Sequence, residues 1–226
     1  MTRATNARIA GVTLLLYIAV GITQMAVFGG TTAGDGTAAR LATMARHATD
    51  VRVNALLTLL TCVVALTLGV ALYALTRDED ADLAMLALMC RVAEGIVGAA
   101  FIPVTLGLLA LATASGADAP PSPAANTVGL FVLAARPWNP IVSACFFAVG
   151  STLFSWLLLR GRMIPAALAW LGVAASVLLV IALPLQLAEL LPRPVTMLIW
   201  MPMLAFEVPL ALWLLTRGAG PATSAR

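Results

Sequence analysis

The chain has 226 residues, of which 62% are hydrophobic and only 10% charged, and its mean hydropathy is +1.01. Soluble domains carry about 25% charged and roughly 45–50% apolar residues, so the composition excludes the soluble globular and disordered classes. The net charge is +3, from 13 bases and 10 acids, and every base is arginine. So few charges exclude a basic face that binds nucleic acid. The composition predicts an integral membrane protein whose main partner is the lipid bilayer.

Six apolar stretches are long enough to cross a membrane, because a helix needs roughly 20 mostly apolar residues to span the hydrocarbon core. None shows the period-two alternation of a β-barrel strand. The predicted fold is therefore all-α, a bundle of six transmembrane helices that forms a single domain over residues 1–226, with a flexible tail at 219–226. The predicted spans are Ile9–Phe28, Val51–Leu75, Leu83–Ala112, Trp138–Leu159, Ala166–Leu190 and Val195–Thr216.

Two of these spans have unusual features. The apolar run of the first span exceeds the roughly 7–15 residues of a signal-peptide core, and no clear cleavage site follows, so this helix is expected to stay uncleaved. The third span is longer than it needs to be, which predicts a tilt or a protruding end. Four prolines lie inside spans and are expected to kink them; they are Pro103, Pro184, Pro202 and Pro209.

The positions of the arginines predict how the protein is oriented. With six spans, both termini and the loops at 76–82 and 160–165 lie on one side of the membrane. Arginine concentrates in cytoplasmic loops, so an excess of seven arginines over five places both termini in the cytoplasm. The seven are Arg3, Arg8, Arg77, Arg160, Arg162, Arg217 and Arg226, and the five are Arg40, Arg46, Arg52, Arg136 and Arg193.

Three connecting segments carry local features. Gly29–Asp50 begins with glycines and continues with Ala38–His47, which is expected to form a short amphipathic helix. Ala114–Ala125 is rich in proline, alanine and serine, which predicts a flexible external loop. Thr127–Ala135 is apolar but too short to cross, so it is expected at the interface or as an extension of the fourth span.

Several membrane-enzyme chemistries need residues that the sequence lacks. Its one histidine, His47, lies in a loop, which excludes bis-histidine haem ligation and a Ser–His dyad between spans. The absence of lysine excludes a retinal-type Schiff base and a Ser–Lys pair. Cys62, Cys90 and Cys145 lie far apart within spans and are expected to pack as small hydrophobic residues. We therefore predict no catalytic residue, no metal and no cofactor.

Three charged residues lie well inside predicted spans, Arg91 and Glu94 in the third and Glu207 in the sixth. A charge at the bilayer centre costs about 2.5–3.5 kcal/mol, so such residues face the bundle interior and seek partners. Arg91 and Glu94 are three residues apart and share one helical face. From the helical rise, Glu94 lies about 16 Å and Glu207 about 14 Å from the same side of the membrane. If the third and sixth helices are neighbours, the three charges form one cluster.

This cluster has two interpretations. In the first, Arg91 and Glu94 form a buried ion pair that sets the helix register, and Glu207 is protonated or bonded to water. In the second, the three residues form a centre that binds a proton or a ligand, because ionisable groups inside a membrane are typically functional. Two carboxyls beside one guanidinium also predict that one glutamate holds a proton near neutral pH.

A second polar group is predicted near the outer face of the membrane. Arg52 and Glu189 lie close enough to span ends to extend their charged tips into the headgroups, so anchoring at the interface is the simpler interpretation of the group. Its members are Gln24, Arg52, Asn54, Gln186 and Glu189.

Several segments, in their order and spacing, resemble the bacterial family catalogued as domain of unknown function 4386, over residues 6–218. They are Arg8-Ile9-Ala10-Gly11, Arg91-Val92-Ala93-Glu94, Phe146-Phe147-Ala148-Val149-Gly150, and the end around Glu207 and Leu210–Gly218. The resemblance implies a multi-pass protein of the bacterial cytoplasmic membrane with no established activity, in which the Arg-x-x-Glu pair and the late glutamate are typical. A histidine that we associate with this family before the fourth helix is absent here, where the chain reads Arg136-Pro137-Trp138-Asn139.

Three classes of function remain open. The first is a non-catalytic protein that binds a small hydrophobic or lipid-like ligand between its helices, oriented by Arg91, Glu94 and Glu207. The second is a proton-coupled carrier of small molecules built on the two glutamates, with two halves of three helices in inverted topology. The third, ranked last because no nucleophile–base pair is evident, is an enzyme that uses a carboxylate as general acid or base on a lipid.

Overall fold

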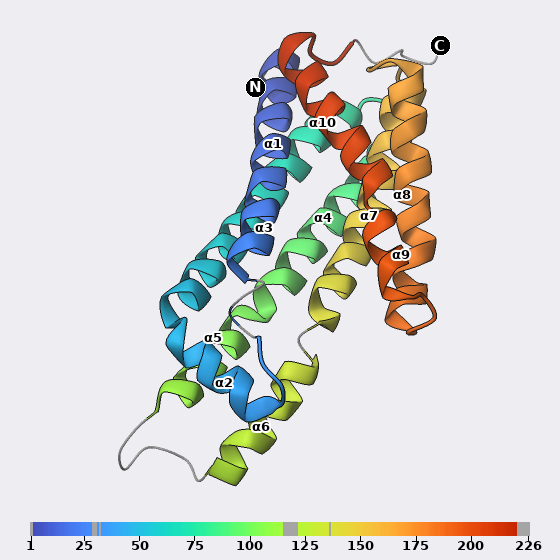
Figure 1. Cartoon of the computed structure of the whole chain (residues 1–226). Helices are drawn as coiled ribbons and strands as arrows, with labels where there is room; N and C mark the ends of the chain where they lie inside the picture. The colour runs from blue at the N-terminus through green and yellow to red at the C-terminus, as the bar shows by residue number, and fades with distance from the viewer. Residues whose placement is uncertain (1, 29–30, 32, 115–121, 136, 221–226) are drawn as a thin grey trace.

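The computed structural model describes residues 2–28, 31, 33–114, 122–135 and 137–220. Within these ranges the chain is helical and contains no strand (Figure 1). The helices are α1 (Arg3–Phe28), α2 (Thr37–Arg46), α3 (Ala48–Thr76), α4 (Ala81–Ala100), α5 (Ile102–Thr113), α6 (Ser122–Ala135), α7 (Trp138–Arg160), α8 (Ala166–Leu187), α9 (Arg193–Leu198) and α10 (Met201–Thr216).

Six helical segments of the described chain are long and apolar enough to cross a membrane, which confirms the predicted all-α class and number of spans. They are formed by α1, α3, α4 with α5, α6 with α7, α8, and α9 with α10. The start of α1 and the end of α10 lie at the same end of the bundle (Figure 1). The placement of that end in the cytoplasm stays a prediction.

The six spans close into a ring. Each span packs against the next along the chain, in the order α1, α3, α4, α7, α8 and α10, and α10 returns to pack against α1. Buried apolar side chains from these six helices form one continuous cluster inside the ring. Large apolar side chains such as Leu56, Val70 and Ile96 are exposed on the outside. Soluble monomers rarely expose such extensive apolar surface, whereas a surface in contact with lipid requires it.

Three of the six spans consist of two helices each; in the fourth, α6 ends at Ala135 and α7 begins at Trp138. The third is divided at Phe101 into α4 and α5, and the sixth is divided at residues 199–200 into α9 and α10. Pro103 and Pro202 occupy the second positions of α5 and α10, where the missing N–H costs nothing. Pro184 and Pro209, in contrast, lie inside α8 and α10 without dividing them. Two of the four prolines therefore accompany a break and two do not.

A small cap covers the end of the bundle opposite the termini (Figure 1). It consists of α2, α5 and α6, which pack around a second apolar cluster of Leu41, Met44, Val51, Leu108 and Leu109. The extra length of the third span forms α5 in this cap. Helix α2 confirms the short helix expected at Ala38–His47.

The structure differs from the sequence prediction in parts of the two segments expected to be flexible. Residues 122–125, expected in a loop, belong to α6, and residues 115–121 of that loop lie outside the described part of the chain. In the expected tail, Gly220 is held at both backbone groups, because its N–H donates to Met163 at 2.9 Å and its carbonyl accepts from Arg3 Nε at 2.9 Å. Residues 221–226 lie outside the described part.

The crossing of α8 with α7 and α10 requires a residue without a side chain at Gly172. A Cβ there would lie 2.5 Å from two ring carbons of Phe206 and 2.8 Å from Ser155 Oγ. We expect Gly172→Ala to lower the free energy of unfolding by about 1–3 kcal/mol, the usual cost of overpacking. Gly107→Ala is the control, because open space surrounds Gly107. In detergent, the free energy of unfolding of this control should equal that of the wild type or exceed it by at most about 1 kcal/mol. Equal losses of stability in both variants would contradict the prediction.

Candidate functional site

A buried ion pair lies in the interior of the ring. Arg91 Nη1 of α4 is 2.8 Å from Glu94 Oε2 one turn later, as their spacing predicts. Tyr17 of α1 donates its hydroxyl hydrogen to Glu94 Oε1 at 2.6 Å. Only 2% of Arg91 and 4% of Glu94 are exposed. Both carboxylate oxygens of Glu94 therefore have a partner, one cationic and one neutral.

Two aromatic rings complete the surroundings of the guanidinium. Arg91 Cζ lies 5.2 Å from the ring centroid of Tyr17 and 5.0 Å from that of Phe147 on α7. The rings are parallel with their centroids 6.2 Å apart, so the guanidinium lies beside the pair and not between the rings. Both distances allow a cation–π attraction, worth about 2 kcal/mol where water is excluded. Tyr17, Arg91, Glu94 and Phe147 are called the Arg91 layer below.

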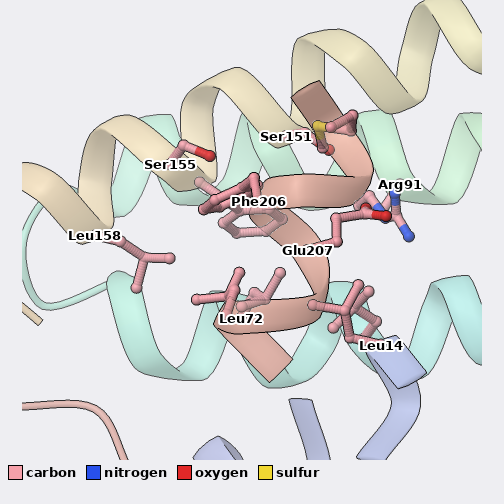
Figure 2. A pocket seen from close by; sticks show the side chains of 12 residues that line it. Leu14, Leu72, Arg91, Ser151, Ser155, Leu158, Phe206 and Glu207 are labelled. Atoms are coloured by element: carbon pink, nitrogen blue, oxygen red, sulfur yellow. The ribbon is translucent and has the colours of Figure 1, made fainter. Parts of the chain in front are cut away.

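Glu207 reaches the same region from α10. It is 9% exposed and lines a small cavity of about 30 Å³ together with Arg91. Figure 2 shows the side chains of Glu207 and Arg91 at the same end of this cavity. Glu207 forms no ion pair within 4.0 Å among the described residues, but it interacts electrostatically with Arg91 and Glu94. The structure thus brings the three predicted charges into one region, with Arg91 paired to Glu94 only.

A much larger cavity, of about 530 Å³, lies on the other side of the Arg91 layer. Glu94, Tyr17 and Phe147 line this large cavity, whereas Arg91 and Glu207 line the small one. Along each helix that borders both cavities, the residues lining the large one lie toward the α2–α5–α6 cap. The Arg91 layer therefore separates two cavities, and its ion pair presents the acid to one and the base to the other.

The large cavity also has neutral polar walls. Gln24 donates from Nε2 to Thr58 Oγ1 at 2.8 Å and accepts from Thr61 Oγ1 at 3.2 Å. Ser143 donates to the backbone carbonyl of Glu94 at 2.9 Å, and Asn139 also lines the cavity. Glu94 is the one charged residue among the described residues that line it.

The predicted second polar group does not come together as one group. Gln24 and Asn54 line the large cavity, but Arg52 is exposed. Gln186 and Glu189 lie at the far end of α8, where Glu189 is exposed with a φ of 58°. Helix α8 contributes no described residue to the large cavity. Gln24 and Asn54 therefore share a cavity that the other three residues do not line, and the anchoring of Arg52 and Glu189 at the membrane interface stays a prediction.

Several residues of the site were not singled out from the sequence as site residues. Tyr17 and Phe147 are aromatic residues in apolar helices, a pattern that predicts packing and nothing more. Asn139 and Ser143 are isolated polar residues near the start of the predicted fourth span. The three cysteines are free, and Cys62 lines the large cavity while Cys90 and Cys145 do not.

Breaking the ion pair should destabilise the protein more than weakening it. We expect Arg91→Met to lower the free energy of unfolding by about 3–5 kcal/mol, because it leaves Glu94 buried without its cation. Tyr17→Phe should cost about 1.5–3 kcal/mol, the value of a hydrogen bond to a charged group. Denaturation in mixed detergent micelles measures both losses.

Two further variants separate this effect from general loss of packing. Adding Glu94→Gln to Arg91→Met should restore part of the lost stability, because the unpaired charge is gone. Tyr73→Phe is the control for Tyr17→Phe. Tyr73 is also partly buried, but its hydroxyl forms no hydrogen bond with the described residues. A double variant less stable than Arg91→Met alone would contradict the assigned pairing.

Comparison with known proteins identifies the family of the chain. No curated protein and no solved structure matches the chain. The profile of the family described as Domain of unknown function (DUF4386) matches residues 9–218, which include the ion pair of α4 together with Tyr17 and Glu207. The match covers nearly the whole chain and confirms the resemblance seen in the sequence. The chain belongs to the DUF4386 family of proteins.

Proposed function

We propose that the protein binds a small hydrophobic or lipid-like molecule in the large cavity, with the polar end of the molecule directed at Glu94. The observation that carries this proposal is the cavity itself. Its volume of about 530 Å³ is within the roughly 300–1,000 Å³ of known ligand sites, which are mostly apolar with a few convergent polar groups. An ion pair that only fixed helix register would not need such a space beside it.

The walls of the large cavity support an amphipathic ligand. Tyr17, Phe147 and Trp200 form an aromatic series, with centroids 6.2 Å apart for the first pair and 6.0 Å for the second. These rings offer apolar contact to a hydrocarbon or ring system. Glu94 lies at the Arg91 layer, and a carboxylate oxygen can accept more than one hydrogen bond. A ligand with a hydroxyl or amine at one end therefore has an acceptor available.

We also propose that the protein resides in the bacterial cytoplasmic membrane with both termini in the cytoplasm. The apolar outer surface of the ring and the arginine excess near the terminal end support this placement. The large cavity, which lies toward the α2–α5–α6 cap, then belongs to the outer half of the membrane. A ligand would reach it from the outer leaflet or from outside the cell.

Native mass spectrometry of gently extracted protein tests the binding proposal. We expect a co-purifying molecule of defined mass on the wild type and its loss in Gly98→Phe, because Gly98 lines the large cavity and a Cβ there makes only ordinary contacts, 3.5 Å to Cys62 Sγ. Gly107→Phe places the same side chain where a Cβ would meet open space, and it should retain the molecule. Wild-type protein without any bound molecule, or an equal bound fraction in both variants, would contradict the proposal.

Thiol labelling of intact cells tests the orientation. In a chain with its three cysteines replaced by alanine, a maleimide that cannot cross membranes should label Arg40→Cys, in the cap, and spare Arg77→Cys, in the turn after α3. Both arginines are exposed, so the two sites have similar access to solvent. Both should react after the cells are opened. Labelling of Arg77→Cys alone in intact cells would contradict the proposed orientation and would place both termini outside the cell.

A further inference from the structure

The small cavity combines an apolar wall with four polar side chains. Eight of its twelve lining residues are leucine, phenylalanine or methionine, and the polar ones are Arg91, Glu207, Ser151 and Ser155. They come from α4, α10 and α7, so three spans each direct polar atoms toward one space. Figure 2 shows Ser151, Arg91 and Glu207 around the same part of the cavity.

Polar atoms on this wall lack partners. Nε and Nη2 of Arg91 are fully buried and have no hydrogen-bond acceptor among the described residues. The carboxyl of Glu207 has neither an ion pair within 4.0 Å nor a hydrogen bond recorded with those residues. Unmade hydrogen bonds of charged groups are among the most costly features of a protein interior. Arg91 and Glu207 both line the small cavity, and their unmade hydrogen bonds indicate that a small polar molecule joins the two side chains.

The size of the cavity limits what that molecule can be. Its volume is about 30 Å³, and a water molecule needs about 10–15 Å³ on this measure and two or more polar partners. One or two waters fit, and no larger ligand does. A water here can accept from an Arg91 N–H and also donate to a Glu207 oxygen.

We propose that the small cavity is a hydrated proton-binding site, in which Glu207 carries an exchangeable proton and water joins its carboxyl to Arg91. Proton release moves a proton from a carboxyl oxygen to a cavity water and leaves a carboxylate, which Arg91 neutralises once Glu94 no longer carries a charge. This site differs from the large cavity in position and ligand, and the inference does not depend on what the large cavity binds.

The charges around Glu207 explain why it holds the proton. The titratable groups that interact electrostatically with it are Arg91 and Glu94 from α4 and Tyr17 from α1. The lining residues of α3 and α7 are leucine, phenylalanine and serine and add no charge. Arg91 is already paired with Glu94, so a second carboxylate would leave one net negative charge in an apolar interior. A proton on Glu207 removes that charge.

The same charge count makes Arg91 a link between the two glutamates. When Glu94 retains its charge, Arg91 stays with it and Glu207 keeps its proton. When Glu94 is neutralised, Arg91 becomes the counter-ion of Glu207, and the proton on Glu207 is released. The occupancy of Glu207 by a proton therefore depends on the charge of a residue in the other cavity.

Infrared spectroscopy of the full-length protein in lipid nanodiscs at neutral pH tests the site. We expect the C=O stretch of a protonated carboxyl in the wild type, a shift of its frequency in Glu207→Asp, and its loss in Glu207→Gln. Glu94→Gln should also abolish the band, because Arg91 is then free to pair with Glu207. Glu189→Gln, which alters an exposed glutamate, should leave it unchanged. In heavy water the wild-type band should shift within the time of buffer exchange.

Each alternative outcome overturns a defined part of the proposal. Absence of the band in wild-type protein, or an unchanged frequency in Glu207→Asp, would show that Glu207 does not carry the proton. A band that resists exchange in heavy water for hours would show that the cavity is dry. A band that survives in Glu94→Gln would contradict the link through Arg91. The carboxyl band and its exchange in heavy water are both measured on the wild-type protein. The proposal can therefore still be refuted if a variant fails to fold.

Discussion

The ion pair of Arg91 and Glu94 organises the interior of the ring, because a guanidinium in apolar surroundings needs favourable contacts from the neighbouring helices. Glu94 supplies the negative charge from the same helix, Tyr17 on α1 holds the other carboxylate oxygen, and Phe147 on α7 offers its ring. On α3, Gly69 leaves room, since a Cβ there would lie 2.9 Å from Arg91 Cβ. Four of the six spans thus meet around one side chain. The spans cannot rotate independently, because any rotation would expose the guanidinium to lipid or separate it from its partners.

Properties that depend on residues close together in the chain could be predicted from the sequence. The hydropathy of a span averages about 20 residues, so the number of spans was predictable, and spacing of three residues was enough to pair Arg91 with Glu94. Properties that depend on the order of helices around the ring were not. Tyr17 could not be distinguished from a packing residue, and Arg52 could not be separated from Asn54 without knowing which way α3 faces. The expected kinks at Pro103 and Pro202 coincide with the breaks at Phe101 and Trp200. Pro184 and Pro209 lie in helices that continue, so the sequence could not show which prolines accompany a break.

Two of the three divided spans have a common relation to the large cavity. Phe101, at the break between α4 and α5, and Trp200, at the break between α9 and α10, both line it. Membrane proteins tolerate an interrupted helix where the break is buried in protein or borders a cavity. A break that served only to turn the chain could lie at any point of the ring. Breaks at the cavity, on two different spans, indicate that the space is a built feature and not a packing defect.

The Arg91 layer also determines how the two cavities can influence each other. Any hydrogen-bond donor or cation that approaches Glu94 from the large cavity competes with Arg91 for the carboxylate, and weaker attraction to Glu94 makes Arg91 a better partner for Glu207. The effect requires no movement of a helix, since Arg91 already borders the small cavity and has two N–H groups without acceptors among the described residues. Attraction between charges is stronger in a medium of low dielectric constant than in water. A ring with a single base between two acids therefore couples its two cavities through the electrostatics of one side chain.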